Sequence, residues 1–220
     1  MASDGEAGRS AREQYEQRIT ASQAKRINVF GPRLGKFLNF LVGDSKSAAA
    51  WSRGALGEAA VGEILNKIAD ENGFHVLHDR AIPGSKSNID HILISNRGVF
   101  VIDAKNYKGL IQLRDQGNFF NSKEVLYVGN RNQSGLVDGA KKQVSIVSNA
   151  LSELDSEIPV IGMLAFVEAD FPLLFKPRSI DGVLINSKGI GASILSQESI
   201  ENVDVEAVAN FLKNAFPAKN

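Results

Sequence analysis

Two β-rich segments, residues 89–94 and 99–105, are separated by Ser-Asn-Arg-Gly, a sequence typical of a hairpin turn. They constrain the fold more than any other feature, because a two- or four-residue reversal at 95–98 fixes the strand register. The facing pairs are then Ile94 with Val99, Ile92 with Val101, and Asp90 with Asp103. A three-residue loop would instead separate the two acids.

The alternation of side chains along a strand predicts a polar cluster on one face of this hairpin. With a period of two, Asp90, Asp103 and Lys105 point to the same side of the sheet. Facing residues have Cβ atoms ~5 Å apart. His91 alternates to the opposite face, where we expect it to be structural.

A pair of carboxylates at this spacing is costly without a compensating charge. Two like charges ~5 Å apart repel by ~3 kcal/mol at an effective dielectric constant near ~20. Lys105 supplies one positive charge, and a hard divalent cation such as Mg²⁺, which prefers oxygen ligands, would supply another. The alternative is an Asp–Asp–Lys cluster on the surface of a half-exposed sheet.

Two amphipathic helices accompany the hairpin. Residues 55–71 carry one apolar stripe, made of Val61, Ile64, Leu65 and Ile68. Glu58 borders this stripe, whereas Glu63 faces solvent. Residues 138–154 carry a second stripe, made of Val144, Val147, Leu151 and Leu154, which Gln143 borders while Lys142 points outward.

The remaining pattern predicts an α/β fold with a central mixed sheet flanked by helices. Short apolar runs of β-forming residues indicate strands at 74–77, 110–113, 125–128 and 183–185. Residues 160–167 form a continuous apolar run, as expected of a strand that is covered on both faces. A last helix is expected at 204–215.

We expect two parts in the chain. Residues 1–50 form a charged extension, with a helix at 9–27, a short apolar segment at 34–42 and a linker at 43–50. Residues 51–220 form the main domain. Segment 9–42 is a candidate surface for a protein partner.

Composition narrows the class of protein. The chain has no cysteine, which excludes disulfides and cysteine-ligated metal sites and fits a reducing compartment. The sequence has no apolar stretch near the ~20 residues of a membrane helix and no signal-peptide core, so we expect a cytoplasmic protein with no membrane contact. A formal net charge of zero argues against a strongly basic nucleic-acid coat.

The segments GALGEAAVGEIL (54–65) and NIDHILISNRGVFVIDAKNYKG (88–109) resemble the nuclease-related domain, a branch of the PD-(D/E)XK nuclease superfamily. The resemblance covers roughly 54–196. It is strongest over 89–109, where the family spacing is matched by Asp90, Gly98, the triplet Asp103-Ala104-Lys105, Asn106 and Gly109. Residues 9–53 are similar to the N-terminal extension of small, stand-alone actinobacterial members.

The resemblance implies a restriction-endonuclease-like core and hydrolysis of phosphodiester bonds, in DNA first and RNA second. It implies that Mg²⁺ or Mn²⁺ binds to Asp90, Asp103 and the backbone carbonyl of Ala104, with Glu58 completing the shell. Lys105 would orient the attacking water and Gln143 would position a phosphate or the water. The alternative is an inactive module of the same fold that binds nucleic acid or a protein partner.

Overall fold

The computed structural model describes residues 46–117, 123–172, 178–186 and 189–219. The chain divides into two compact units, Met1–Leu56 and Gly57–Asn220, and the fold below is that of the second unit. The helix expected at 9–27 and the apolar segment expected at 34–42 lie outside the described residues.

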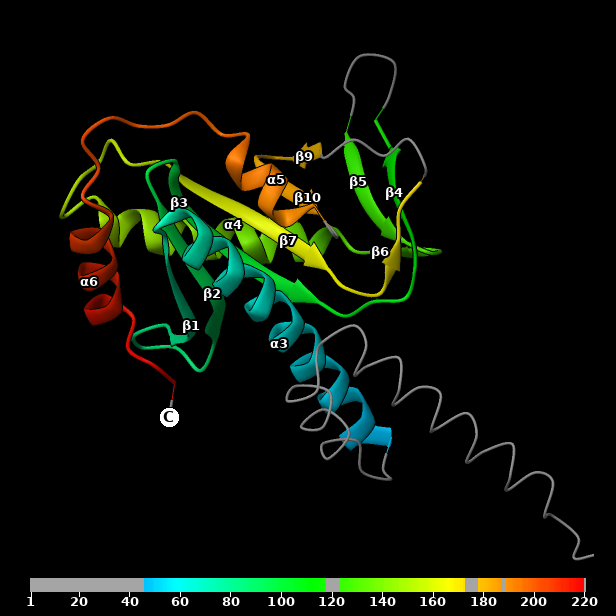
Figure 1. Cartoon of the computed structure of the whole chain (residues 1–220). Coiled ribbons are helices and arrows are strands. Elements are labelled where there is room, and N and C mark those ends of the chain that lie inside the picture. The colour runs from blue at the N-terminus through cyan, green and yellow to red at the C-terminus, as the bar shows by residue number, and fades with distance from the viewer. Residues whose placement is uncertain (1–45, 118–122, 173–177, 187–188, 220) are drawn as a thin grey trace, which may run out of the picture. The chain divides into compact units, whose positions relative to one another are not determined.

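The described chain begins with a helix and continues with a run of strands, a second helix, a second run of strands and two final helices (Figure 1). The elements are α3 (Lys46–Asn72), β1 (His75–Ala81), β2 (Asn88–Ser95), β3 (Gly98–Lys105), β4 (Gly109–Asp115), β5 (Glu124–Val128), β6 (Arg131–Asn132), α4 (Ser134–Leu151), β7 (Val160–Phe166), β8 (Ala169–Asp170), β9 (Arg178–Ile180), β10 (Val183–Asn186), α5 (Ile190–Leu195) and α6 (Val205–Ala215). Within the described ranges, no helix combines the length and the apolar character needed to cross a membrane.

The central sheet has six strands in the order β1-β2-β3-β7-β10-β9. The first three strands form an antiparallel meander, β7 lies parallel to both β3 and β10, and β9 returns antiparallel to β10. The mixed sheet flanked by helices that the sequence predicts is therefore confirmed. β3, the strand that carries Asp103 and Lys105, lies inside this sheet and is bonded on both edges.

The predicted hairpin register is also confirmed. Ile94 pairs with Val99 and Ile92 with Val101, as a tight reversal at 95–98 requires. Continuing the same register brings Asp90 opposite Asp103 at the open end of the hairpin. The strand register set by the turn at 95–98 is therefore what brings the two acids together.

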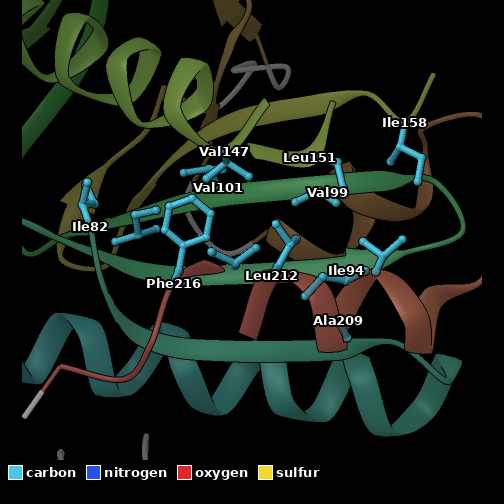
Figure 2. Close-up of a cluster of buried hydrophobic side chains, with 13 residues drawn as sticks. Ile82, Ile94, Val99, Val101, Val147, Leu151, Ile158, Ala209, Leu212 and Phe216 are labelled. Carbon is cyan, nitrogen blue, oxygen red and sulfur yellow. The ribbon is translucent and has the colours of Figure 1, made fainter. Parts of the chain in front are cut away.

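One face of the sheet packs against α4 and α6 (Figure 2). Ile94, Val99 and Val101 point to this side and meet Val147 from α4 and Leu212 from α6, all fully or almost fully buried. The helix α6 begins at Val205 because the Asp204 carboxylate accepts a hydrogen bond from the Ala207 amide at 2.9 Å, which caps the helix start. This face is the one on which the alternation places Asp103 and Lys105.

The opposite face of the sheet packs against α3 and α5. Leu93, Phe100 and Ile102 alternate to this side and contact Val61 and Leu65 from α3. The expectation that Ile64 is buried is wrong, since it is 40% exposed. The buried side of α3 includes small residues instead, Ala60, Gly62 and Ala69, which let the helix lie close to the sheet.

Several element boundaries also differ from expectation. Residues 46–50, expected as a linker, are helical and belong to α3. Leu154, expected in the buried stripe of the second helix, is 46% exposed, because α4 ends at Leu151 and the chain turns away. The short strands β6, β8 and β9 and the helix α5 carry too few residues to produce a periodic pattern, and the sequence did not predict them.

A second, four-stranded sheet follows directly from β3, with the order β6-β5-β4-β8. β4 and β5 form an antiparallel hairpin in which Gln112 pairs with Tyr127. Ile111, Leu126 and Val128 point inward and pack against Val137 and Ala140 of α4. The other face of the hairpin points away from this core.

Candidate functional site

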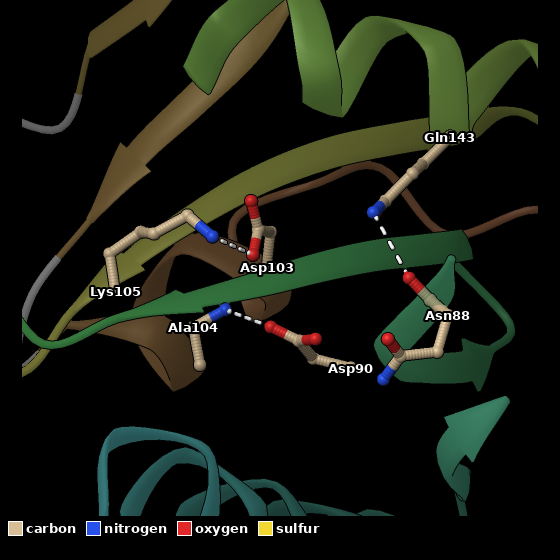
Figure 3. Close-up of polar contacts among 6 residues, drawn as sticks. All are labelled: Asn88, Asp90, Asp103, Ala104, Lys105 and Gln143. Atoms are coloured by element: carbon tan, nitrogen blue, oxygen red, sulfur yellow. Dashed lines mark hydrogen bonds and ion pairs between the residues drawn. The ribbon is translucent and has the colours of Figure 1, made fainter. Parts of the chain in front are cut away.

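Asp90 and Asp103 lie at the open end of the β2–β3 hairpin, as Figure 3 shows. The Asp90 Oδ2 atom accepts a hydrogen bond from the Ala104 amide at 3.0 Å. The Asp103 Oδ1 atom accepts one from the Lys105 ammonium at 2.5 Å. These contacts use one oxygen of each carboxylate, and each keeps a second oxygen.

The Lys105–Asp103 pair is largely buried. The Lys105 side chain is 22% exposed and that of Asp103 is 12% exposed. An ion pair shielded to this extent is screened much less by salt than a surface pair. The ammonium is therefore held in one place beside the carboxylates, as a group that orients water or phosphate must be.

Among the described residues, Asp90 has no such cation in direct contact. Burial, followed by the nearby Asp103 carboxylate and Glu58, raises the pKa of this carboxyl to about 8, although the hydrogen bond from the Ala104 amide lowers it in part. At neutral pH Asp90 therefore keeps its proton for most of the time. That proton relieves the repulsion expected between the two acids. A bound cation would relieve it in the same way.

Glu58 is brought to this site by the close approach of α3 to the end of β3. A Cβ atom at Gly57 would lie 3.0 Å from the Asn106 Cβ atom, so a residue with a side chain would push the helix or Asn106 away. Glu58 is half-buried and Glu63 exposed, as predicted. Burial raises the pKa of Glu58, Asp79 and Asp103 raise it as well, and Lys105 lowers it. These influences place Glu58 within electrostatic reach of Lys105 and Asp103.

Gln143 reaches the site from α4, while Lys142 is exposed, as the helical pattern predicts. Its Nε2 atom donates to the backbone carbonyl of Asn88 at 3.4 Å (Figure 3). Its Oε1 atom is buried without a hydrogen-bond partner among the described residues. A buried acceptor of this kind needs a donor such as water.

Three residues that the sequence reading missed support this arrangement. Asn88 donates from Nδ2 to Asp79 Oδ1 at 2.7 Å, and its Oδ1 accepts from the Lys219 ammonium at 3.3 Å. Asn88 thus links the C-terminal segment to Gln143. Its position two residues before Asp90 was a usable signal, because alternation places both on one face. The approach of Lys219 is long-range and has no counterpart in the local pattern.

His91 lies on the face opposite the acids, as predicted. Its Nδ1 atom is 2.8 Å from Nδ1 of His78, and His78 Nε2 is 2.9 Å from the Asn66 side-chain oxygen. Burial lowers the pKa of His91 to about 3, with His78 adding to the effect. This neutral pair ties β1 and β2 to α3.

The residues present fit a magnesium-type site better than a zinc-type site. Among the described residues, no three His, Cys, Asp or Glu side chains are grouped closely enough to hold a metal ion by themselves. Mg²⁺, however, keeps several waters and is typically bound by one or two carboxylates. Asp90 and Asp103 supply two carboxylates, and the buried Oε1 of Gln143 can accept from a bound water.

Comparison with known proteins identifies the family. The chain is 39% identical over 69 residues to an uncharacterized protein of Bacillus anthracis, a match that covers 30% of this chain and 32% of that protein. The matched region thus spans about a third of that relative's length. No solved structure matches the chain. The family model described as "Nuclease-related domain" matches residues 53–167, which include Glu58, both hairpin acids, Lys105 and Gln143. Because this match covers just over half of the sequence, the chain belongs to the nuclease-related domain family.

Proposed function

We propose that this protein is a metal-dependent nuclease that hydrolyses phosphodiester bonds of DNA, with RNA as the second candidate. The observation that carries the proposal is the buried group of Asp90, Asp103 and Lys105 at the open end of one hairpin. Family membership supports a nuclease-related role. The lack of cysteine fits the cytoplasm, where we place the activity.

Asp90, Asp103 and the Ala104 carbonyl would hold Mg²⁺ or Mn²⁺, with Glu58 joining directly or through water. The bound metal would supply Lewis-acid polarisation of the phosphate and a water of lowered pKa. Asp90 must lose its proton to act as a ligand, since a ligating carboxylate is deprotonated. Its pKa of about 8 makes binding of the cation weaker as pH falls below that value.

Lys105 has the central role among the protein groups. Its ammonium is fixed by Asp103 at 2.5 Å, so it is preorganised to orient the attacking water and to stabilise negative charge on the phosphate. Gln143 offers its buried Oε1 atom as an acceptor for a water hydrogen. Asn88 holds the Gln143 amide from the other end.

A nuclease assay tests the proposal. Plasmid, duplex and single-stranded DNA and an RNA strand are incubated with Mg²⁺, Mn²⁺ or EDTA, and cleavage is expected only with metal. Lys105→Ala should lower the rate by about 100- to 1000-fold, the usual cost of losing one preorganised electrostatic group. DNA affinity in Ca²⁺ should change much less, because one cation is only part of the phosphate contacts.

Glu63→Ala is the matched control, because Glu63 lies on the same helix as Glu58 but is exposed. It should cleave at the parent rate. Equal rates for Lys105→Ala and Glu63→Ala would show that Lys105 is not in the active site. A parent protein that binds DNA and never cleaves it would sink the enzyme hypothesis.

The second candidate is an inactive module of the same fold that binds nucleic acid or a protein partner, the latter through residues 9–42. One observation favours it. The described residues contain no three-ligand metal group, and Lys105 already neutralises Asp103. The same assay separates the two candidates, since only the enzyme turns over.

A further inference from the structure

The outward face of the β4–β5 hairpin carries a polar cluster that the proposed reaction does not use. Ile111, Leu126 and Val128 point into the core. Side chains one position along, Gln112 and Arg114 on β4 and Tyr127 on β5, therefore point the other way. Among these, Arg114 is exposed.

These side chains are held together in a fixed arrangement. The Arg114 guanidinium carbon lies 4.1 Å from the centroid of the Tyr127 ring. Arg114 also donates from Nε and Nη2 to the Gln112 side-chain oxygen at 3.0 Å and 2.6 Å. Gln116 donates to the Tyr127 hydroxyl at 2.6 Å. The planar guanidinium is thus supported from below by a ring and from the side by an amide.

The charge of Arg114 is left for a ligand. Its contacts are with a neutral amide and a neutral ring, and no carboxylate forms an ion pair with it in the described part of the chain. A guanidinium that is stacked but not neutralised suits a planar, anionic partner, because it can stack on a nucleobase and donate to phosphate. Aromatic rings and Arg guanidinium planes are the groups on which proteins stack unpaired bases.

The position of the cluster suits a nucleic acid bound at the hairpin acids. β4 begins at Gly109, four residues after Lys105. Arg114 lies five residues further, about 17 Å at ~3.3 Å per residue. That is about five nucleotide steps at ~3.4 Å per step. Arg114 therefore lies several nucleotide steps beyond the start of β4, the strand that follows the one carrying Lys105.

We propose that Arg114 and Tyr127, flanked by Gln112 and Gln116, form a base-stacking platform for single-stranded nucleic acid. A duplex keeps its base faces inside the stack, so the platform favours unpaired over paired substrate. The inference rests on the proposed nuclease function for its choice of ligand, but binding can be measured without cleavage.

The test is fluorescence anisotropy in EDTA and in Ca²⁺, with a labelled oligothymidine, the matching oligouridine and a DNA duplex of the same length. Arg114→Ala should weaken single-strand binding by about 5- to 100-fold, the weight that stacking of one base carries. Duplex binding should change by less than about threefold. The oligouridine arm shows whether the platform prefers RNA or DNA, and either preference supports it.

Two variants separate stacking from charge. Arg114→Lys keeps the charge and loses the planar group, so it should lose most of the single-strand affinity, as Arg114→Ala does. Tyr127→Leu removes the ring against which the guanidinium is stacked, so it should also weaken single-strand binding. Arg131→Ala is the control, because Arg131 is an exposed cation of the same sheet whose strand partner, Val128, points to the core side. It should reduce single-strand and duplex binding equally and slightly.

Three outcomes would overturn the platform: no single-strand binding by the parent, an Arg114→Lys variant that binds like the parent, or equal effects of Arg114→Ala and Arg131→Ala on both substrates. A different result would show that the nuclease proposal fails while the platform stands. In that case no metal supports cleavage, while Arg114→Ala still loses single-strand binding. Thermal melts of each variant confirm that the fold is retained.

Discussion

The two ends of the β2–β3 hairpin differ in how their buried polar groups are paired. At the turn, the Ser95 hydroxyl donates to the Gly98 carbonyl at 3.0 Å and accepts from the Arg97 amide at 3.1 Å. At the open end, Asp90 and Asp103 lie together, and burial together with the Asp103 carboxylate raises the pKa of Asp90 to about 8. The turn end is arranged for stability, whereas the open end holds a buried acid whose ionisation is unfavourable.

This difference is typical of an active site built on a rigid scaffold. The apolar middle of the hairpin, Ile92 to Ile94 and Val99 to Val101, is fully or almost fully buried. It fixes the distance between the acids through the strand register. The unfavourable free energy of burying the acids at the open end is therefore offset by apolar packing elsewhere in the same two strands.

The largest expected effect comes from breaking the turn end. Gly98 has φ of 118°, and a Cβ atom there would lie 2.7 Å from the Pro159 carbonyl oxygen. Gly98→Ala should cost roughly 3 kcal/mol or more, since it adds backbone strain to a clash with main chain. Urea unfolding measures this loss. Gly139→Ala, at an open helical position, should instead be neutral or stabilising by up to ~1 kcal/mol.

The next largest effect is at the open end, where the free energy of unfolding should depend on pH. Because the folded-state pKa of Asp90 is raised above its usual value of 3.8, the folded protein binds the proton more tightly than the unfolded chain. The stability linked to this proton is complete at low pH and is lost as pH rises through about 8. Metal-free parent protein should lose on the order of 2 kcal/mol between about pH 6 and about pH 8, at up to ~1.4 kcal/mol per pH unit.

Asp90→Asn should remove this slope and be the more stable protein at the upper pH. His91 does not confuse the comparison. Its pKa is lowered to about 3, so its stability contribution is complete above the usual histidine value of 6.5 and decreases as pH falls below that value. Both proteins carry His91, so this change cancels in the difference between them. Asp181→Asn, at an exposed carboxylate, is the control and should keep the parent slope. Parallel curves for the parent and Asp90→Asn would contradict the coupling of the two acids.

A divalent cation should stabilise the open end of the hairpin, where the two acids lie. If Mg²⁺ or Mn²⁺ replaces the Asp90 proton, a metal concentration of ten times the dissociation constant should stabilise the fold by about 1.4 kcal/mol. For a domain of this size that raises the melting temperature by roughly 3–6 °C. Asp103→Asn should lose most of the gain. A melting temperature that does not respond to millimolar metal would count against a metal site.

The smallest expected effect is at the turn. Ser95 is fully buried, and Ser95→Ala removes one donor and one acceptor. The loss should be about 1 kcal/mol, the usual net value of a buried hydrogen bond. Ser148→Ala, on an exposed part of α4, should stay within ~0.5 kcal/mol of the parent. A Ser95→Ala variant as stable as the parent would mean that the turn is held by Gly98 and packing alone.

The sequence predicted what local periodicity controls. The register of the hairpin, the shared face of Asp103 and Lys105 and the half-buried positions of Glu58 and Gln143 all follow from periods of two and of about 3.6 residues. Ile64 was misplaced because the pattern records where apolar residues lie, whereas the helix turned its glycine and alanine side to the sheet. Asn88, Asp79 and Lys219 were missed because they meet through tertiary contacts.

The parallel pairing of β3 with β7 has a consequence for the order of folding. Val99 pairs with Val160, far along the chain, whereas β1, β2 and β3 pair with immediate neighbours. Local hairpins close in ~1–10 μs, and distant strands pair later because their loop entropy is lost before contacts form. Asp90 and Asp103 therefore meet before α4 delivers Gln143. A cation bound by the two acids would act on this early hairpin, so we expect it to speed folding as well as to slow unfolding.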